Sequence, residues 1–265
     1  MLILNIVVLI KQVPGTDNVK LDPETGVMIR SGKDTIINPL DENALEEAIR
    51  IKNSHPNVKV TAVSMGPESA IKALKEAVAM GADAGVLISG RAFAGSDTIA
   101  TAKALAATIK KLGPVDLVIC GERATDGETG QTGAMIANYL DIPVQTYVSS
   151  VEIQQAGVVV KRTVEGGFER VEVPFPVLIT VNKDINEPGF PTLAGKLRAK
   201  QVEITIWRPE ELGLDKSELG LVGSPTRVVK VFSPKLARDT ILHKADGTTG
   251  PVDELMKFLA AKEVL

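Results

Sequence analysis

Four apolar runs stand out in the first half of the chain. They read ILNIVVLI, KVTAVSMG, AGVLIS and VDLVIC, at positions 3–10, 59–66, 84–89 and 115–120. Apolar residues occupy successive positions in these runs, as is typical of strands that are buried on both faces of a sheet. We therefore predict four buried strands, each too short to span a membrane.

Between these runs the spacing of apolar residues changes to that of helices. Segments 41–54, 67–82 and 96–113 each carry apolar residues three or four positions apart. Ser96 or Asp97 is suited to cap the third helix. Because strands and helices alternate, we predict an α/β, doubly wound fold with a mainly parallel sheet covered on both faces.

The pattern changes again after about residue 145. Residues 148–181 alternate apolar and polar positions across turn signals at 156–157 and 166–167, which predicts an antiparallel extension at the edge of the sheet. Segment 182–201 is interrupted by several Pro and Gly residues, so we predict a long loop there.

The last part of the chain is rich in turn residues and ends in a helical pattern. A strand candidate lies at 227–234 and a helix candidate at 251–265. We divide the chain into an α/β domain, residues 1–207, and a C-terminal arm, residues 208–265, that is suited to dock on a partner.

Composition excludes several classes of function. A net charge of −3 gives no general attraction to nucleic acid or to an anionic membrane, and no apolar run is long enough for an integral membrane segment. Cys120 is the only cysteine, which excludes an internal disulfide and fits a reducing compartment. His55 and His243 are too isolated in the sequence to suggest a metal site. We expect a cytoplasmic protein.

One loop carries the candidate chemistry. After the fourth apolar run the chain reads GERATDGETGQTG, from Gly121 to Gly133, and then enters an apolar helical stretch. Glycines let a backbone approach a ligand closely, and the free amides at a helix start attract anions. Thr129, Gln131 and Thr132 add neutral donors. The loop thus predicts a phosphate-binding site, with a plain helix-capping turn as the alternative.

The acids of this loop need a different explanation, because a carboxylate repels phosphate. Asp126 and Glu128 precede the helix start, where they could cap the turn or bind ribose hydroxyl groups. The loop matches neither a P-loop nor the GxGxxG fingerprint. Residue chemistry alone therefore predicts a nucleotide binder and goes no further.

Several segments, in order, resemble the beta subunit of electron transfer flavoproteins. They are VLIKQVP, INPLDENALEEAIRIK, VSMGP, EAVAMGAD, DGETGQTGAMIANYLDIP and NEPGFPTLAGKLRAK. The resemblance covers nearly the whole chain. It implies an adenine nucleotide alpha hydrolase-like fold and a heterodimer with an alpha subunit that carries a redox-active FAD.

The resemblance also implies which residues contact the nucleotide of this subunit. The phosphates would rest on the loop between Thr129 and Thr132, in agreement with the reading of that loop. Leu9 and Met65 have core packing as an alternative role. The implied nucleotide contacts are Leu9, Lys11, Asn38, Pro39, Ser64, Met65, Gly121, Arg123, Ala124, Thr125, Asp126, Gly127, Thr129, Gly130, Gln131, Thr132 and Gly133.

The nucleotide could be AMP, as in ordinary members, or FAD, as in the electron-bifurcating branch. Segment 91–106, RAFAGSDTIATAKALA, and Gly127 resemble the bifurcating branch. This favours FAD, with Ser96, Asp97 and Thr98 facing its ribityl chain or flavin ring. The alternative is AMP, with residues 96–98 serving only as a helix cap.

With FAD, the implied activity is hydride transfer from NADH, or back to NAD, with electrons divided between two acceptors. These are the alpha-subunit FAD, which serves an FAD-linked dehydrogenase of acyl-CoA or a hydroxy acid such as lactate, and ferredoxin or flavodoxin. No residue need act as a general acid or base.

Segment 184–200 is implied to recognise the dehydrogenase. Leu193 would be its apolar anchor, flanked by Arg198 and Lys200; composition alone would place Leu193 in a small satellite core. A free-standing adenine-nucleotide regulatory protein is the competing function, and it would leave this segment unexplained.

Overall fold

The computed structural model describes residues 4–15, 35–229, 240, 242, 244 and 247–264. The chain divides into two compact units, Met1–Val229 and Lys230–Leu265. Most of the predicted strand at 227–234 lies outside the described residues, as does His243. The proposed domain boundary after residue 207 stays a prediction.

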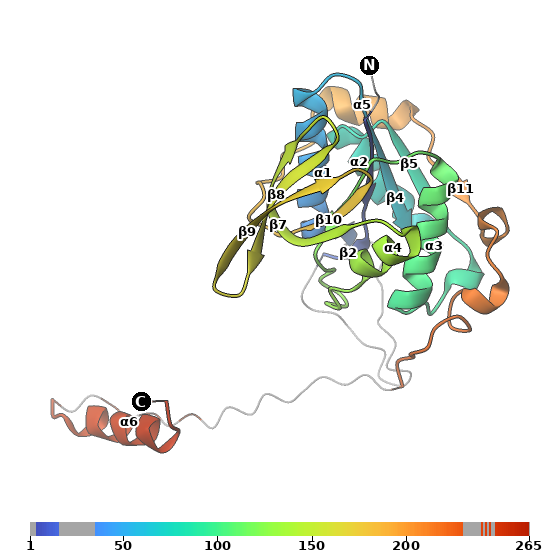
Figure 1. Cartoon of the computed structure of the whole chain (residues 1–265). Coiled ribbons are helices and arrows are strands. Elements are labelled where there is room, and N and C mark those ends of the chain that lie inside the picture. The colour runs from blue at the N-terminus through green and yellow to red at the C-terminus, as the bar shows by residue number, and fades with distance from the viewer. Residues whose placement is uncertain are drawn as a thin grey trace. The chain divides into compact units, whose positions relative to one another are not determined.

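The first unit is built on a nine-stranded sheet in the order β11-β5-β4-β1-β6-β10-β7-β8-β9 (Figure 1). Pairing is parallel from β11 to β7 and antiparallel from β7 to β9. The strands are β1 Leu4–Leu9, β4 Val58–Met65, β5 Ala84–Ile88, β6 Leu117–Gly121, β7 Val144–Ile153, β8 Gly157–Val164, β9 Gly167–Pro174, β10 Val177–Val181 and β11 Thr205–Trp207. The four predicted strands are confirmed as β1, β4, β5 and β6.

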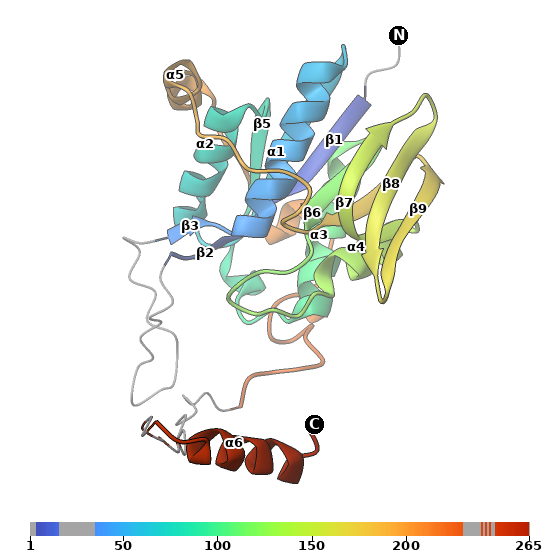
Figure 2. The same cartoon turned by 90° about the vertical axis from the view of Figure 1, so that its left-hand side faces the viewer.

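Helices cover both faces of the sheet, which confirms the doubly wound fold (Figure 2). Helices α1 (Pro39–Ser54), α2 (Ile71–Met80) and α5 (Leu193–Gln201) contribute to one apolar cluster. Helices α3 (Thr98–Leu112) and α4 (Thr132–Leu140) contribute to the other. A separate ribbon pairs β2 (Gln12–Pro14) with β3 (Thr35–Ile37).

Two predictions from the sequence are wrong in part. The antiparallel reading of 148–181 holds for β7, β8 and β9, but β10 pairs in parallel with both β6 and β7. All five residues of β10 are buried, so its run VLITV belongs to the same class as the four predicted strands.

The predicted loop at 182–201 also contains a helix, α5. Thr192 caps it, since its Oγ1 accepts a hydrogen bond from the Gly195 amide at 3.0 Å. Gly195 lets α5 approach α2, because a Cβ there would collide with the carbonyl group of Ala79. Gly195, which suggested a loop in the sequence, therefore lies at a close contact between two helices.

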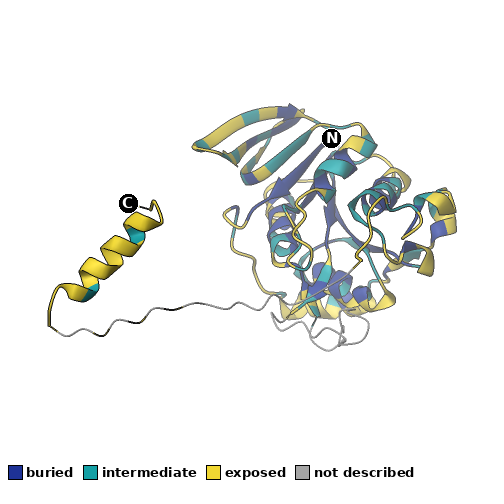
Figure 3. Ribbon diagram, turned by 90° about the horizontal axis from the view of Figure 1, so that it is seen from below, coloured by how far each residue is buried: buried dark blue, intermediate teal, exposed yellow. Residues whose placement is uncertain are grey.

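The second unit contains the predicted C-terminal helix, α6, which runs Gly250–Ala261. None of its residues is buried (Figure 3). No helix among the described residues has the length and apolar character to cross a membrane.

Candidate functional site

The predicted nucleotide contacts gather where the parallel strands β1, β4 and β6 end. Leu9 in β1 lies opposite Val63 in β4 and Cys120 in β6, so these strands end at the same edge of the sheet. In an open α/β sheet this carboxyl edge is where ligands bind. The register thereby brings Lys11, Ser64, Met65 and the loop from Gly121 to one edge.

Asn38 fixes the glycine-rich loop from within the protein. Its side chain is fully buried; Nδ2 donates to the Arg123 carbonyl oxygen at 2.9 Å, and Oδ1 accepts from the Thr125 amide at 3.1 Å. Its own amide donates to the Lys11 carbonyl oxygen at 2.8 Å. Asn38 therefore ties the segments after β1 and β6 together, while the neighbouring Pro39 is exposed.

Asp41 joins the same two segments. It was not among the site residues predicted from the sequence. Its carboxylate accepts from the amides of Lys11 at 2.8 Å and Gly121 at 3.0 Å. Burial raises the pKa of Asp41 to about 7, although these hydrogen bonds and the Lys11 ammonium group oppose the shift. Acids are common in the first turn of a helix, so their presence does not indicate burial. The apolar neighbours of Asp41 were the one sign in the sequence that it is buried.

The raised pKa of Asp41 predicts that stability falls as pH rises. The folded state keeps the proton above the ordinary pKa of 3.8, so this contribution is lost progressively up to about pH 7 and is constant above it. From about pH 5.5 to about pH 8, the free energy of unfolding should fall by about 2 kcal/mol. Urea unfolding of the full chain across this range measures the slope.

Asp41→Asn, which cannot titrate, should flatten that slope whatever its effect on absolute stability. Glu42 and Glu122, whose pKa values burial also raises, remain in the variant and set the residual slope. An unchanged slope in the variant would show that Asp41 is already ionised throughout this range.

The acids of the loop are paired with bases, which explains how they can stand near the predicted anion site. The Lys11 ammonium group lies 2.6 Å from Oδ1 of Asp126, whose side chain is only 9% exposed. Arg123 lies 2.8 Å from Glu122 and 3.7 Å from Glu128. The carboxylate of Asp126 is thus bound by Lys11, which leaves ribose binding by Asp126 as an untested prediction.

The rest of the loop is open and leads into α4. The Ala124 carbonyl oxygen accepts from the amides of Gly127 and Glu128 at 3.2 and 2.8 Å, forming a tight turn. Thr129 and Gly130 are exposed, and Gly130 has φ +62°. No side chain in the described part of the chain caps α4 at Gln131. The amides of its first turn, beginning at Thr132, are available to an anion.

Two glycines of the loop are required by packing. A Cβ at Gly133 would lie 2.6 Å from the Thr180 Cγ2 and 3.0 Å from the Cys120 Sγ. A Cβ at Gly121 would lie 2.7 Å from the Leu40 Cβ. Gly133 is therefore needed for helix-to-sheet packing, and its close approach to a ligand stays a prediction, whereas Gly127 has nothing within 4 Å of a built Cβ.

Ser64 has a buried hydroxyl group without a partner. Its Oγ is the one buried side-chain polar atom without a hydrogen bond in the described residues. Leu9 is a core residue, 6% exposed, and Met65 is partly buried beside the same cluster. Because a buried unpaired hydroxyl group is unfavourable, Ser64 is suited to a polar ligand at the end of β4.

Residues 96–98 form a helix cap, as their alternative reading predicted. Oδ1 of Asp97 accepts from the amides of Ile99 and Ala100 at 2.9 and 3.0 Å, and α3 begins at Thr98. The Ser96 hydroxyl donates to the Phe93 carbonyl oxygen at 2.8 Å. None of the hydrogen bonds found among the described residues joins 96–98 to the loop at 121–133.

The predicted partner-binding residues divide into two groups. Leu193 is 77% exposed, which rules out a core role, and Lys200 is also exposed. Arg198 is half-buried and donates to the carbonyl oxygens of Val78 and Ala82, at the end of α2. Arg198 therefore holds α5 in place, and Leu193 is presented by that helix.

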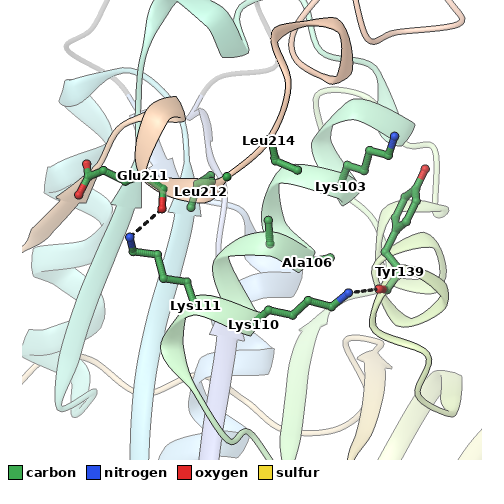
Figure 4. Close-up of a pocket in the computed structure, with 10 residues that line it drawn as sticks. Lys103, Ala106, Lys110, Lys111, Tyr139, Glu211, Leu212 and Leu214 are labelled. Carbon is green, nitrogen blue, oxygen red and sulfur yellow. Dashed lines mark hydrogen bonds between the residues drawn. The ribbon is translucent and has the colours of Figure 1, made fainter.

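A hollow of about 640 Å³ lies elsewhere, between α3, α4 and residues 211–214 (Figure 4). Lys110 donates to the Tyr139 carbonyl oxygen at 2.8 Å and Lys111 to that of Glu211 at 2.7 Å. Lys103 is paired with Glu218 at 2.8 Å. Because all three ammonium groups are engaged, we do not place the anion site here. No group of side chains in the described residues has the composition of a metal site.

Comparisons with known proteins identify the family of the chain. A family model described as electron transfer flavoprotein domain matches residues 25–212. The electron transfer flavoprotein subunit beta of Thermoanaerobacterium thermosaccharolyticum is 51% identical over 236 residues, covering 89% of this chain and 90% of that protein.

Two further relatives carry more specific names. The caffeyl-CoA reductase-Etf complex subunit CarD of Acetobacterium woodii is 47% identical over 231 residues, or 87% of this chain and 88% of that protein. Protein FixA of Azotobacter vinelandii is 44% identical over 236 residues, or 86% and 84%. Because the family model and these relatives each span most of the chain, it belongs to the electron transfer flavoprotein family, as a beta subunit that pairs with an alpha subunit.

Proposed function

We propose that this beta subunit binds FAD at the carboxyl edge of its sheet and exchanges hydride with NADH. The electrons gained from NADH would then divide between the alpha-subunit FAD and a low-potential carrier, ferredoxin or flavodoxin. FAD, when bound, supplies both hydride and one-electron chemistry. The loop at 121–133 and Ser64 would hold it, and no residue of this chain need act as a general acid or base.

The observation that carries the proposal is the open, uncapped start of α4. Its first-turn amides are free for a diphosphate, and Gly130 holds the left-handed turn before them. Gly127 has no positive φ and nothing within 4 Å of a built Cβ, so the protein's own packing does not require a glycine there and the space beside it is open to a ligand. Ser64 offers an unused hydroxyl group at the same edge.

Binding of AMP in place of FAD is the competing hypothesis, and the hydrogen bonds of Asp97 favour it. The carboxylate of Asp97 is used by the protein itself, so it is not free to meet a flavin. The resemblance of segments 91–106 and 124–133 to the bifurcating branch supports FAD. Gly127 belongs to that resemblance and has no packing role.

Counting nucleotides in the purified heterodimer tests the proposal. Two FAD and no AMP are expected after extraction, and NADH should bleach the flavin absorbance without any dehydrogenase present. One FAD with one AMP, and no response to NADH, would reduce the chain to an ordinary electron carrier with a structural nucleotide.

We propose two protein contacts in addition. The helix α6 exposes Val252, Leu255 and Met256 on one apolar stripe, 51–60% accessible, which suits docking on the alpha subunit. The exposed Leu193 suits recognition of an FAD-linked dehydrogenase. The name of the CarD relative supports an acyl-CoA enzyme for this role, with a hydroxy-acid enzyme as the alternative. We place this assembly in the cytoplasm.

A further inference from the structure

Residues 219–226, within the C-terminal arm, are hydrogen-bonded to segment 91–98. The Leu221 amide donates to the Ala94 carbonyl oxygen at 3.0 Å, and the Asp97 amide donates to Oγ of Ser224 at 2.8 Å. Both the amide and the hydroxyl group of Thr226 donate to Oδ2 of Asp97, at 3.1 and 2.9 Å. These bonds cross about 130 residues of sequence.

Packing supports the same contact. Gly220 has φ +55°, and a Cβ built on it would lie 2.8 Å from the Ala94 carbonyl oxygen. Leu219 is 2% exposed and belongs to the apolar cluster of α3 and α4. Residues 219–226 are therefore seated against segment 91–98 by a close backbone approach, a buried side chain and several hydrogen bonds.

Asp97 divides its two oxygens between two tasks. Oδ1 caps α3, while Oδ2 holds Thr226. Partial burial opposes ionisation, but the hydrogen bonds to the carboxylate together lower its pKa. The carboxylate is thus charged at neutral pH and keeps its bonds there.

We propose that residues 219–226 are a latch that holds segment 91–98 in position, and that Asp97 is the positioning residue that joins them. Residues 219–226 are then part of the wall of the nucleotide site, although they are far from the other site segments in sequence. The inference rests on the proposed function in one respect, that segment 91–98 lies against the bound nucleotide.

Asp97→Asn separates the two tasks, because asparagine caps a helix as well as aspartate does with its Oδ1, whereas the Nδ2 that replaces Oδ2 cannot accept the Thr226 donors. In the heterodimer, hydrogen exchange at the Thr226 amide should become roughly tenfold faster, with Ile99 and Ala100 unchanged. Nucleotide retained on dilution should fall by a similar factor.

Matched variants isolate the latch. Thr226→Val removes a donor without touching the charge of Asp97 and should weaken nucleotide retention in the same direction, whereas Thr226→Ser should restore it. Asp215→Asn changes another capping aspartate, one whose oxygen serves only its own turn at Ser217, and should have no effect on retention.

Two results would overturn the inference. Unchanged exchange at Thr226 in Asp97→Asn would mean that the latch does not hold the arm in solution. Faster exchange with normal nucleotide retention would mean that Asp97 has no positioning role. Because retention is scored for whichever nucleotide is present, extraction of AMP would contradict the proposed function and still leave the latch to be judged on these measurements.

Discussion

Replacing Asn38 with alanine should release the nucleotide and destabilise the chain. The variant leaves the Arg123 carbonyl group and the Thr125 amide without the partner that a buried side chain provides. Each unpaired group costs about 1–3 kcal/mol, so the free energy of unfolding should fall by about 3 kcal/mol. The loop would lose its tie to the segment after β1. Nucleotide content of the heterodimer and urea unfolding of the full chain measure the two effects.

Asn43→Ala is the matched control, because it removes another buried asparagine, in the helix α1 that follows Asn38. The Asn43 side chain donates to the Asn186 carbonyl oxygen at 2.8 Å, away from the glycine-rich loop. It should lower stability to a similar degree and leave the nucleotide bound. Equal loss of nucleotide in both variants would mean that Asn38 acts only through global stability.

Leu193→Ala should weaken electron delivery to the dehydrogenase by about 30-fold in kcat/KM, the size expected for an apolar hot spot of about 2 kcal/mol. Leu193 is 77% exposed, so its truncation removes little that stabilises the chain. Nucleotide content and unfolding free energy should stay the same. Steady-state transfer to the partner dehydrogenase, at varied dehydrogenase concentration, measures the change.

Phe168→Ala provides the control for loss of an exposed apolar side chain. Phe168 is 61% exposed on β9, at the end of the sheet opposite to β11. It should leave electron delivery unchanged. A Leu193 variant that loses nucleotide, or that behaves like the Phe168 variant, would contradict the assignment of α5 as the recognition element.

Much of the fold could be predicted because local pattern and tertiary environment agree. The four strands with successive apolar residues are buried, and the helices that were predicted begin within a few residues of their expected starts. The errors arose where one residue type has two uses. Gly195 suggested a loop but mediates helix contact, and the run in β10 followed alternating strands and was read as one of them.

The candidate site was predictable only as far as its loop. The glycines and threonines before α4 indicated an anion site, whereas the network behind them depends on distant residues. Asp41 contacts Gly121 across 80 positions, and Asp97 contacts Thr226 across 129. Local periodicity carries no information on contacts between such distant residues. The sequence therefore gave no sign that these carboxylates accept hydrogen bonds within the protein.

The outer strand β9 has a consequence for self-association. As the last strand in the sheet order it presents an edge, and bare edges recruit strands from other molecules into aggregates. Along β9, however, Glu169, Arg170 and Glu172 are exposed, and Pro174, which lacks an amide donor, ends the strand. Charge and proline therefore discourage edge-to-edge growth at this border of the sheet.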